Sequence, residues 1–466
     1  MLERIIKKNQ NKIAYKINDL ELSYADLIDK SKKYGDLLKK QGESPIIIYG
    51  HKNIDMFVSI FACLHSGRAY IPIDLCTPME RIKKIINCTN SNLIITNENL
   101  DISNIEHATL NDLEKYKDYP DNKIDNNIAY IIFTSGSTGD PKGVPITYNN
   151  LLNFIKWINT IKPLNEYDNV NVLNQASFSF DLSVADIYYS VSNGHTLIAL
   201  DKDSQENYND IFNKIYDNKI DVLVVTPTFI KLCMVNKEFN AINYPTIKCI
   251  YFCGEQLEIS MVKSLYERFP KINIINAYGP TEATSAVSAI NITPDMLNDD
   301  ILPCGSANMF ATEIIIENGE IILKGNSVCG GYLSNYTGGF YKEDDINCFK
   351  TGDIGFIKDD KLYCKGRKDS QIKYKGYRIE LNDIENNLYK IKGVKQCAVV
   401  AKYQNEYIVK MIKAYVVLED GYNVEYVKEN LKRFVPLYMM PKIIVEMNFL
   451  PINCNGKIDR KQLKEL

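Results

Sequence analysis

The chain has 466 residues, more than one hydrophobic core usually holds, so two or more domains are expected. Its 45% hydrophobic and 24% charged residues are typical of a globular protein, which argues against disorder. The net charge of −3 gives no general reason to expect nucleic acid or an anionic membrane surface as a partner.

Short apolar β-rich runs alternate with helical stretches from residue 45 to residue 270. The runs include "PIIIYG" (45–50), "AYIPI" (69–73), "DVLVV" (221–225) and "CIYFCG" (249–254), and "SMVKSLYERFP" (260–270) is a helical stretch. This alternation predicts an α/β fold in which helices cover parallel sheets.

The pattern changes in the last third of the chain. Closely spaced strands joined by an Asn-Gly turn are predicted at 312–325. After "KGRKDSQ" (365–371) a unit of about a hundred residues begins, large enough for a small domain. Its predicted elements are a helix at 380–391, strands at 396–403 and 411–420, and a helix at 424–434.

The segment "FTSGSTGDPKGV" (133–144) combines glycines, hydroxyl side chains and a lysine, which together suit phosphate oxygens. It is not the usual phosphate loop of nucleotide hydrolases, because five residues separate Gly136 from Lys142. A buried strand is predicted directly before it, at 128–133. The loop therefore leaves the carboxyl end of a strand, where α/β proteins bind ligands.

The cysteines, the histidines and the apolar runs argue against a zinc protein, a secreted protein and a membrane protein. The twelve cysteines form no C-x-x-C pair and the four histidines lie far apart, so a zinc site is not expected. No apolar run reaches the length of a membrane span, and the start has no signal-peptide core. A cytoplasmic protein with reduced cysteines and no membrane insertion is predicted.

Further short motifs follow the loop, and each alone is typical of an ordinary turn. They are "SFSFDLSV" with Asp181, "NAYGPTEAT" (276–284), "FKTGDIG" with Asp353, "KGRKD" with Arg367 and Asp369, "YKGYRIEL" with Gly376, and "NCNGKIDRK" with Lys457. Together and in this order they resemble the adenylate-forming superfamily of acyl-CoA synthetases, luciferases and nonribosomal adenylation domains.

Within that superfamily the chain looks most like the D-alanine–carrier protein ligases, through "FSFDLSVADIY", "YFCGEQL" and "GRKDSQIKYKGYRIELNDIE". The resemblance covers nearly the whole chain. It implies a large N-terminal adenylation core of parallel-sheet α/β layers plus a small β-barrel, residues 1–368. A small mobile α+β lid domain, residues 369–466, would carry the catalytic lysine.

The resemblance implies a reaction in two steps. A small amino acid, D-alanine first, would attack MgATP to give an aminoacyl-AMP and pyrophosphate, and would then pass to a phosphopantetheine thiol. Because the chain ends soon after the lysine motif, the carrier protein is expected to be a separate one. The alternatives are a stand-alone nonribosomal adenylation enzyme for another small amino acid, and a non-catalytic nucleotide-binding relative.

The resemblance also implies roles for individual residues of an ATP site. Glu282 would bind Mg²⁺, and Lys457, Thr281 and Glu282 would be catalytic. The residues implied in ATP binding are Thr134, Ser135, Gly136, Ser137, Thr138, Gly139, Lys142, Asn276, Ala277, Tyr278, Gly279, Pro280, Thr281, Asp353, Arg367 and Lys457.

An amino-acid pocket is implied around Asp181, whose carboxylate would hold the substrate ammonium; the alternative is a helix cap. Lys457 would hold the substrate carboxylate. The implied walls are Leu182, Ala185, Val224, Tyr251, Cys253, Ala277, Ser285 and Ala286. Cys253 stands where the D-alanine ligases carry a cysteine associated with preference for the D-enantiomer, whereas Ala185 and Ser285 depart from the family pattern and leave more room or polarity.

Two further positions concern the second step. Asp369 is the expected hinge of the mobile domain, and Gly376 is expected to border the channel through which the thiol enters.

Overall fold

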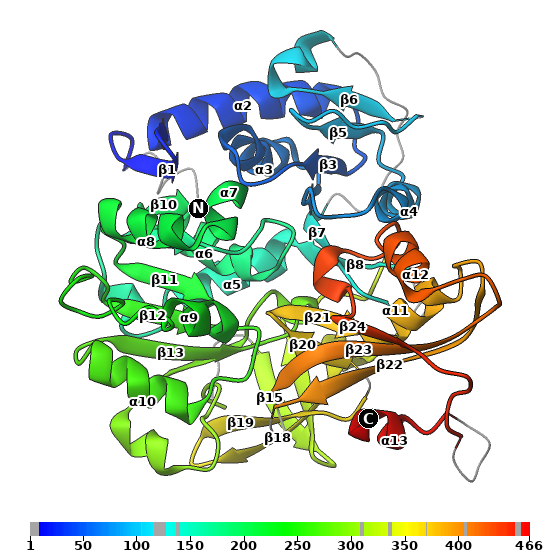
Figure 1. The fold of residues 1–466 in the computed structure, drawn as a ribbon. Coiled ribbons are helices and arrows are strands. Elements are labelled where there is room, and N and C mark those ends of the chain that lie inside the picture. The colour runs from blue at the N-terminus through cyan, green and yellow to red at the C-terminus, as the bar shows by residue number, and fades with distance from the viewer. Residues whose placement is uncertain are drawn as a thin grey trace.

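A computed structural model of the chain (Figure 1) describes residues 9–103, 105–115, 127–136, 140–307, 312–333, 338–369, 371–404, 408–452 and 458–466. Two large sheets with their helices form the N-terminal part, and a smaller antiparallel sheet follows. The C-terminal domain packs against the N-terminal part. None of the helices described is both long enough and apolar enough to span a bilayer.

The larger sheet has eight strands, of which the six inner ones are parallel and the two edge strands antiparallel. The inner strands are short apolar runs because helices cover both faces. In spatial order the strands are β14 (Ser288–Asn291), β13 (Asn273–Tyr278), β12 (Cys249–Phe252), β11 (Val222–Val225), β9 (Asn171–Asn174), β10 (Thr196–Ala199), β1 (Ile13–Ile17) and β2 (Leu20–Ser23).

The second sheet has six strands and includes the strand predicted at 128–133, which is confirmed as β7. The strands in order are β6 (Glu106–Ala108), β5 (Leu93–Ile95), β3 (Ile46–Tyr49), β4 (Tyr70–Ile73), β7 (Ile128–Thr134) and β8 (Lys142–Thr147). Thr134 pairs with Lys142 in an antiparallel register, so the glycine-rich segment is the turn of a β7–β8 hairpin.

The helices divide into those between the sheets and those outside them. Helices α3, α5 and α6 lie between the sheets, with α2 against α3; α3 is buried on all sides for this reason. Helices α8, α9 and α10 cover the other face of the eight-stranded sheet, and α4 the outer face of the second. The helices are α2 (Tyr24–Lys40), α3 (Ile54–Ser66), α4 (Met79–Thr89), α5 (Tyr148–Ile158), α6 (Leu182–Asn193), α7 (Lys202–Glu206), α8 (Tyr208–Asp217), α9 (Pro227–Cys233) and α10 (Ile259–Arg268).

A five-stranded antiparallel sheet stands where the small β-barrel is expected. The predicted hairpin is confirmed: Asn318 and Gly319 have φ of +52° and +79°, as a two-residue hairpin turn requires. The strands are β15 (Thr312–Glu317), β16 (Glu320–Gly325), β17 (Phe340–Glu343), β18 (Ile346–Lys358) and β19 (Lys361–Arg367).

The C-terminal domain begins with a two-stranded hairpin and continues with a three-stranded sheet that has its own hydrophobic core. The helix and strand types predicted there are confirmed, and the helix predicted to reach 391 ends at Leu388. The elements are β20 (Gln371–Tyr374), β21 (Tyr377–Glu380), α11 (Leu381–Leu388), β22 (Val394–Tyr403), β23 (Val409–Leu418), α12 (Val424–Leu431), β24 (Ile443–Glu446) and α13 (Arg460–Glu465).

The topology brings the predicted site residues to one edge of the molecule. Strands β11, β12 and β13 are parallel neighbours, so their carboxyl ends lie side by side. The hairpin β20–β21 of the C-terminal domain lies against this edge (Figure 1). The site is therefore assembled from both domains.

Candidate active site

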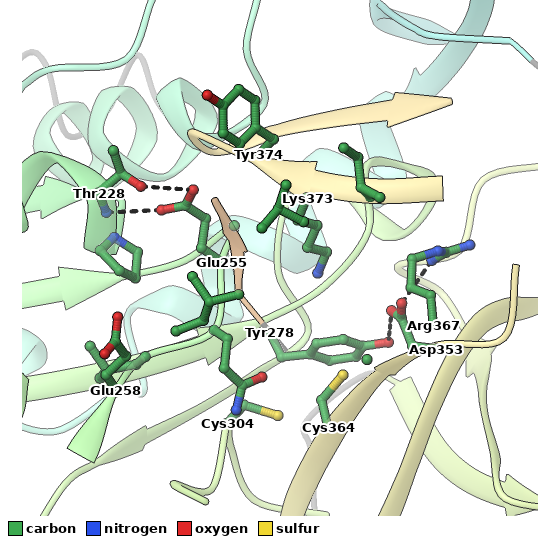
Figure 2. A pocket seen from close by; sticks show the side chains of 18 of the residues that line it. Thr228, Glu255, Glu258, Tyr278, Cys304, Asp353, Cys364, Arg367, Lys373 and Tyr374 are labelled. Carbon is green, nitrogen blue, oxygen red and sulfur yellow. Dashed lines mark hydrogen bonds and ion pairs between the residues drawn. The ribbon is translucent and has the colours of Figure 1, made fainter. Parts of the chain in front are cut away.

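A cavity of about 380 Å³ lies at this edge between the two domains (Figure 2). The ends of β12 and β13 line it from one domain, and hairpin β20–β21 lines it from the other. A second cavity, of about 60 Å³, is lined by Ser135, Asp181 and Thr281. The two cavities bring together residues predicted from motifs that lie far apart in the sequence.

A tyrosine, a carboxylate and a guanidinium form one wall of the larger cavity. The Tyr278 hydroxyl donates to Asp353 Oδ2 at 2.7 Å, and Arg367 donates to Asp353 Oδ1 at 2.7 Å (Figure 2). Burial raises the pKa of Asp353, but the charges of Lys373 and Arg367 outweigh burial and hold this pKa below its usual value. An ionised carboxylate therefore sits at the centre of this wall.

Lys373, on β20, adds a positive charge beside that wall. Its ammonium lies 5.3 Å from the centroid of the Tyr278 ring. Burial lowers the pKa of Lys373, but the Asp353 carboxylate more than offsets this, and the pKa is raised. The lysine is thus a permanent cation inside the cavity.

The remaining residues of "NAYGPT" also lie at the end of β13. Asn276 donates its side-chain amide to the carbonyl of Pro303 at 2.8 Å, and Ala277 and Gly279 line the larger cavity. Pro280 precedes a 3₁₀ turn, Thr281–Ala283, that presents Thr281 to the smaller cavity.

Asp181 occupies the position before α6 but does not cap it, because its side chain makes no capping hydrogen bond. Its Oδ2 instead accepts a hydrogen bond of 2.6 Å from the Thr281 hydroxyl. Burial raises the pKa of Asp181 to about 6, although the bond from Thr281 works against this rise. The helix-cap alternative is therefore wrong, and the carboxylate faces a cavity.

The residues predicted as walls of a pocket around Asp181 are all buried, and of them only Ala277 lines either of the two cavities described above. Burial first, and then the charge of Asp181, raises the pKa of Cys253 to about 12, which keeps this thiol neutral. Ser285 has φ of +69°, a left-handed backbone that is uncommon for serine and typical of functional sites. The Tyr251 hydroxyl is buried, with no hydrogen-bond partner among the described residues. The other buried members are Leu182, Ala185, Val224, Ala277 and Ala286.

The glycine-rich segment predicted to bind phosphate contacts the C-terminal domain, and its residues Ser137, Thr138 and Gly139 lie outside the described part of the chain. The Ser135 hydroxyl donates to the carbonyl of Arg378 and accepts from the amide of Glu380, both at 2.9 Å. Lys142 Nζ lies 3.7 Å from Glu380 Oε1. A Cβ at Gly136 would lie 2.0 Å from the carbonyl oxygen of Asp140, so this turn accepts only glycine.

Glu282 is fully buried and has a partner for each carboxylate oxygen. The Tyr332 hydroxyl donates to Oε1, and the Arg378 guanidinium donates to Oε2. Among the described residues, no three histidine, cysteine or carboxylate side chains come together as a metal site. Glu282 is thus a single carboxylate held against a cation from the other domain.

The predicted hinge and thiol-channel residues lie at the domain boundary. Asp369 accepts two hydrogen bonds from Arg367, at 2.9 and 2.8 Å. Gly376 has φ of +82°, and its amide donates to Glu255 Oε1 at 2.8 Å. A Cβ on Gly376 would lie 2.5 Å from the Thr226 methyl group, so the close approach of the domains requires glycine here.

Lys457 lies outside the described residues. Ile458, the first described residue after it, packs with Leu450 and Leu463 in a cluster of the C-terminal domain. Ile458 does not line either of the two cavities described above.

A thiol also borders the smaller cavity. Cys76 is an exposed residue on the rim that it shares with Asp181 and Tyr377. Desolvation by its surroundings, followed by the nearby Asp74 carboxylate, raises the pKa of Cys76 to about 12.

Sequence reasoning missed Lys373, Arg378 and Glu255. Lys373 and Arg378 are directly paired across hairpin β20–β21, so both side chains leave the same face of it. The alternation in "QIKYKGYRIE" could have revealed a hairpin with two cations on one face. Glu255 gave no signal, since a glutamate after Cys-Gly resembles any surface residue.

Comparison with known proteins defines the class. Residues 2–333 match the AMP-binding enzyme family, and residues 383–457 match the AMP-binding enzyme C-terminal domain. The chain therefore belongs to the AMP-binding enzymes and is an adenylate-forming ligase. It is 38% identical to the D-alanine–D-alanyl carrier protein ligase of Listeria monocytogenes over 99% of this chain and 98% of that one.

Solved structures confirm the fold. The Vibrio cholerae adenylation domain AlmE in complex with glycyl-adenosine-5'-phosphate has a TM-score of 0.83 at 23% identity, covering 100% of this chain and 96% of that one. The structure of the o-succinylbenzoate-CoA synthetase MenE of Bacillus subtilis bound to its product analogue has a TM-score of 0.84 at 19% identity, and the match covers 100% of this chain and 98% of that one. The same enzyme in complex with AMP, with equal coverage, has a TM-score of 0.68 at 20% identity.

Proposed function

We propose that the protein activates a small amino acid, with D-alanine favoured, as its aminoacyl-AMP and transfers it to the phosphopantetheine thiol of a separate carrier protein. The observation that carries this proposal is the Asp181 carboxylate, which faces a small cavity beside Thr281 in a chain 38% identical to a D-alanine–D-alanyl carrier protein ligase. A buried carboxylate without a cation is unfavourable, and the α-ammonium of an amino acid would neutralise it.

A second candidate is a stand-alone adenylation enzyme for another small amino acid. The buried Tyr251 hydroxyl, without a partner among the residues described, favours a substrate that carries a polar group. The small side chains at Ala185 and Ser285 are compatible with such a substrate.

In the first step, a carboxylate oxygen of the amino acid attacks the α-phosphorus of ATP, and the bond to pyrophosphate breaks. Tyr278 is suited to stack on adenine, and Asp353 is suited to accept the ribose hydroxyls with Arg367 beside it. Thr281 would stabilise the charge that develops on the α-phosphate. Lys457 would hold the substrate carboxylate against the phosphate.

Glu282 is suited to bind a magnesium ion. The buried Glu282 already holds a positive group, the Arg378 guanidinium, so it can hold a cation when that arginine is absent. Mg²⁺ typically takes one or two carboxylates, with phosphate oxygens and water as its other ligands. The ion would there neutralise charge on the phosphates of ATP.

In the second step, the thiol sulfur attacks the acyl carbon and AMP leaves with its phosphate. The arrangement with Gly376 packed against Thr226 and Glu255 is suited to this step, because hairpin β20–β21 then lines the larger cavity. Rotation of residues 369–466 about Asp369 would exchange this hairpin for Lys457. The need for ATP and a carrier is consistent with a cytoplasmic location.

Pyrophosphate exchange with a panel of D- and L-amino acids tests the proposal. We expect ATP–pyrophosphate exchange with D-alanine and small D-amino acids, and little with L-enantiomers. The Asp181→Ala variant should lose exchange with every amino acid. Exchange confined to fatty or aryl acids, with Asp181→Ala fully active, would contradict the proposed substrate class.

A further inference from the structure

Strand β21 of the C-terminal domain occupies the phosphate end of the predicted ATP site. Ser135, Lys142 and Glu282 are three of the described residues predicted to bind the triphosphate or its magnesium ion. Each of them contacts β21 instead. The contacts therefore fall on the same groups that the substrate would need.

The groups on β21 match the substrate in charge. The Glu380 carboxylate faces the Lys142 ammonium at 3.7 Å, as a phosphate oxygen would. The Arg378 guanidinium pairs with the Glu282 carboxylate, as a divalent cation would. The backbone of the same strand satisfies the Ser135 hydroxyl as both donor and acceptor.

One buried side chain fixes both charged groups on β21. Gln371, directly across the hairpin from Glu380, donates to Glu380 Oε1 at 2.6 Å and accepts from Arg378 Nε. Gln371 is almost completely buried. The anion and the cation are thus held together as one unit, and either both reach the phosphate loop or neither does.

We propose that β21 is a charge-matched substitute for magnesium pyrophosphate. The C-terminal domain can adopt this arrangement only after magnesium and pyrophosphate have left, because both need Lys142 and Glu282. Arg378 and Glu380 are then positioning residues that enforce the order of the two half-reactions. This inference rests on the proposed function for the location of the triphosphate, and it adds a mechanism of ordering to it.

Docking of β21 and binding of magnesium pyrophosphate exclude each other in this proposal, so each must weaken the other. If magnesium pyrophosphate displaces β21, then weakening the β21 contacts must strengthen the binding of magnesium pyrophosphate, by up to the same factor. This consequence can be measured without an amino acid, a carrier protein or turnover.

Isothermal titration of magnesium pyrophosphate into the full-length protein provides the test. Arg378→Gln and Glu380→Gln each remove one charge from β21 and should each bind magnesium pyrophosphate about five-fold or more tightly than the wild type. Lys375→Asn is the matched control: it removes one charge from the same hairpin, and asparagine tolerates its φ of +52°. Its affinity should stay within about two-fold of the wild type.

Hydrogen exchange of the wild-type protein provides a second measurement that needs no variant. Saturating magnesium pyrophosphate should speed amide exchange in the peptide from Gln371 to Glu380, because the Glu380 amide loses its bond to Ser135. Unchanged exchange, or equal affinity in all four proteins, would overturn the inference while leaving amino-acid activation intact. A wild type that binds neither MgATP nor magnesium pyrophosphate would overturn the proposed function as well.

Discussion

Gly376→Ala should slow transfer to the carrier without slowing adenylation. The substitution has two energetic costs: a clash that lowers the population of the docked arrangement, and a backbone strain that lowers the stability of the C-terminal domain. The added Cβ would lie 2.5 Å from the Thr226 methyl group, and this clash exists only while the hairpin is docked. Overpacking of this kind costs about 1–3 kcal/mol, which corresponds to a population of the docked arrangement about 5- to 150-fold lower.

The second cost is conformational. At φ of +82°, alanine is disfavoured by about 1–2 kcal/mol, but the hairpin keeps this backbone whether or not it is docked. This cost lowers the stability of the C-terminal domain without favouring either arrangement. Transfer from preformed aminoacyl-AMP to the carrier should therefore fall by the clash factor, and pyrophosphate exchange should stay near the wild-type rate.

A compensating substitution makes the prediction sharper. Thr226→Ser removes the clashing methyl group and keeps the hydroxyl, which accepts the capping hydrogen bond from the Phe229 amide. The Gly376→Ala/Thr226→Ser double variant should regain most of the transfer rate, measured by single-turnover loading of the carrier. If the double variant transfers no faster than Gly376→Ala, or if Gly376→Ala transfers normally, the close approach of the two domains does not limit transfer.

Four further predictions follow from the same geometry. Lys457→Ala should abolish adenylation measured by pyrophosphate exchange, whereas transfer from preformed aminoacyl-AMP should survive; equal loss in both would indicate a structural role. Asp369→Pro should slow transfer and spare adenylation because it fixes φ, with Asp369→Ala, which also loses the bonds from Arg367, as its control. As pH falls through about 6, Asp181 takes up a proton and loses its attraction for the ammonium, so kcat/KM for the amino acid should fall about tenfold per unit below that pH; a profile flat down to pH 5 would contradict this role. Cys253→Ala should raise activity with the disfavoured enantiomer by a factor equivalent to about 1–3 kcal/mol and keep the favoured one, and an unchanged D/L ratio would exclude Cys253 as the chiral wall.

The fold was predictable where periodicity and turn chemistry agreed. The apolar run at 128–133 and the Asn318–Gly319 turn each gave a strand or hairpin at the expected place, because burial and positive φ allow few alternatives. The extent of the glycine-rich loop was overestimated, since Lys142 pairs in a strand. A lysine that is part of a ladder looks the same in sequence as one in a loop.

The site was predictable as a set of motifs but not as a set of contacts. Asp181 and Thr281 come from motifs a hundred residues apart, and only the topology shows that their side chains meet. The pairing of Glu282 with Arg378 joins the two domains and depends on how they are arranged, which no local pattern encodes. The buried Tyr251 hydroxyl likewise depends on what surrounds it in space.

The thiol on the rim of the smaller cavity raises a question of chemical selectivity. An aminoacyl-AMP can react with thiolates, and Cys76 lines the same cavity as Asp181, the residue proposed to hold the amino acid. Because its pKa is raised, Cys76 is present at pH 7 mainly as the thiol, which is far less nucleophilic than the thiolate. Desolvation of Cys76 by its surroundings, followed by the nearby Asp74 charge, would thus disfavour acylation of the enzyme itself and leave the intermediate for the thiol of the carrier.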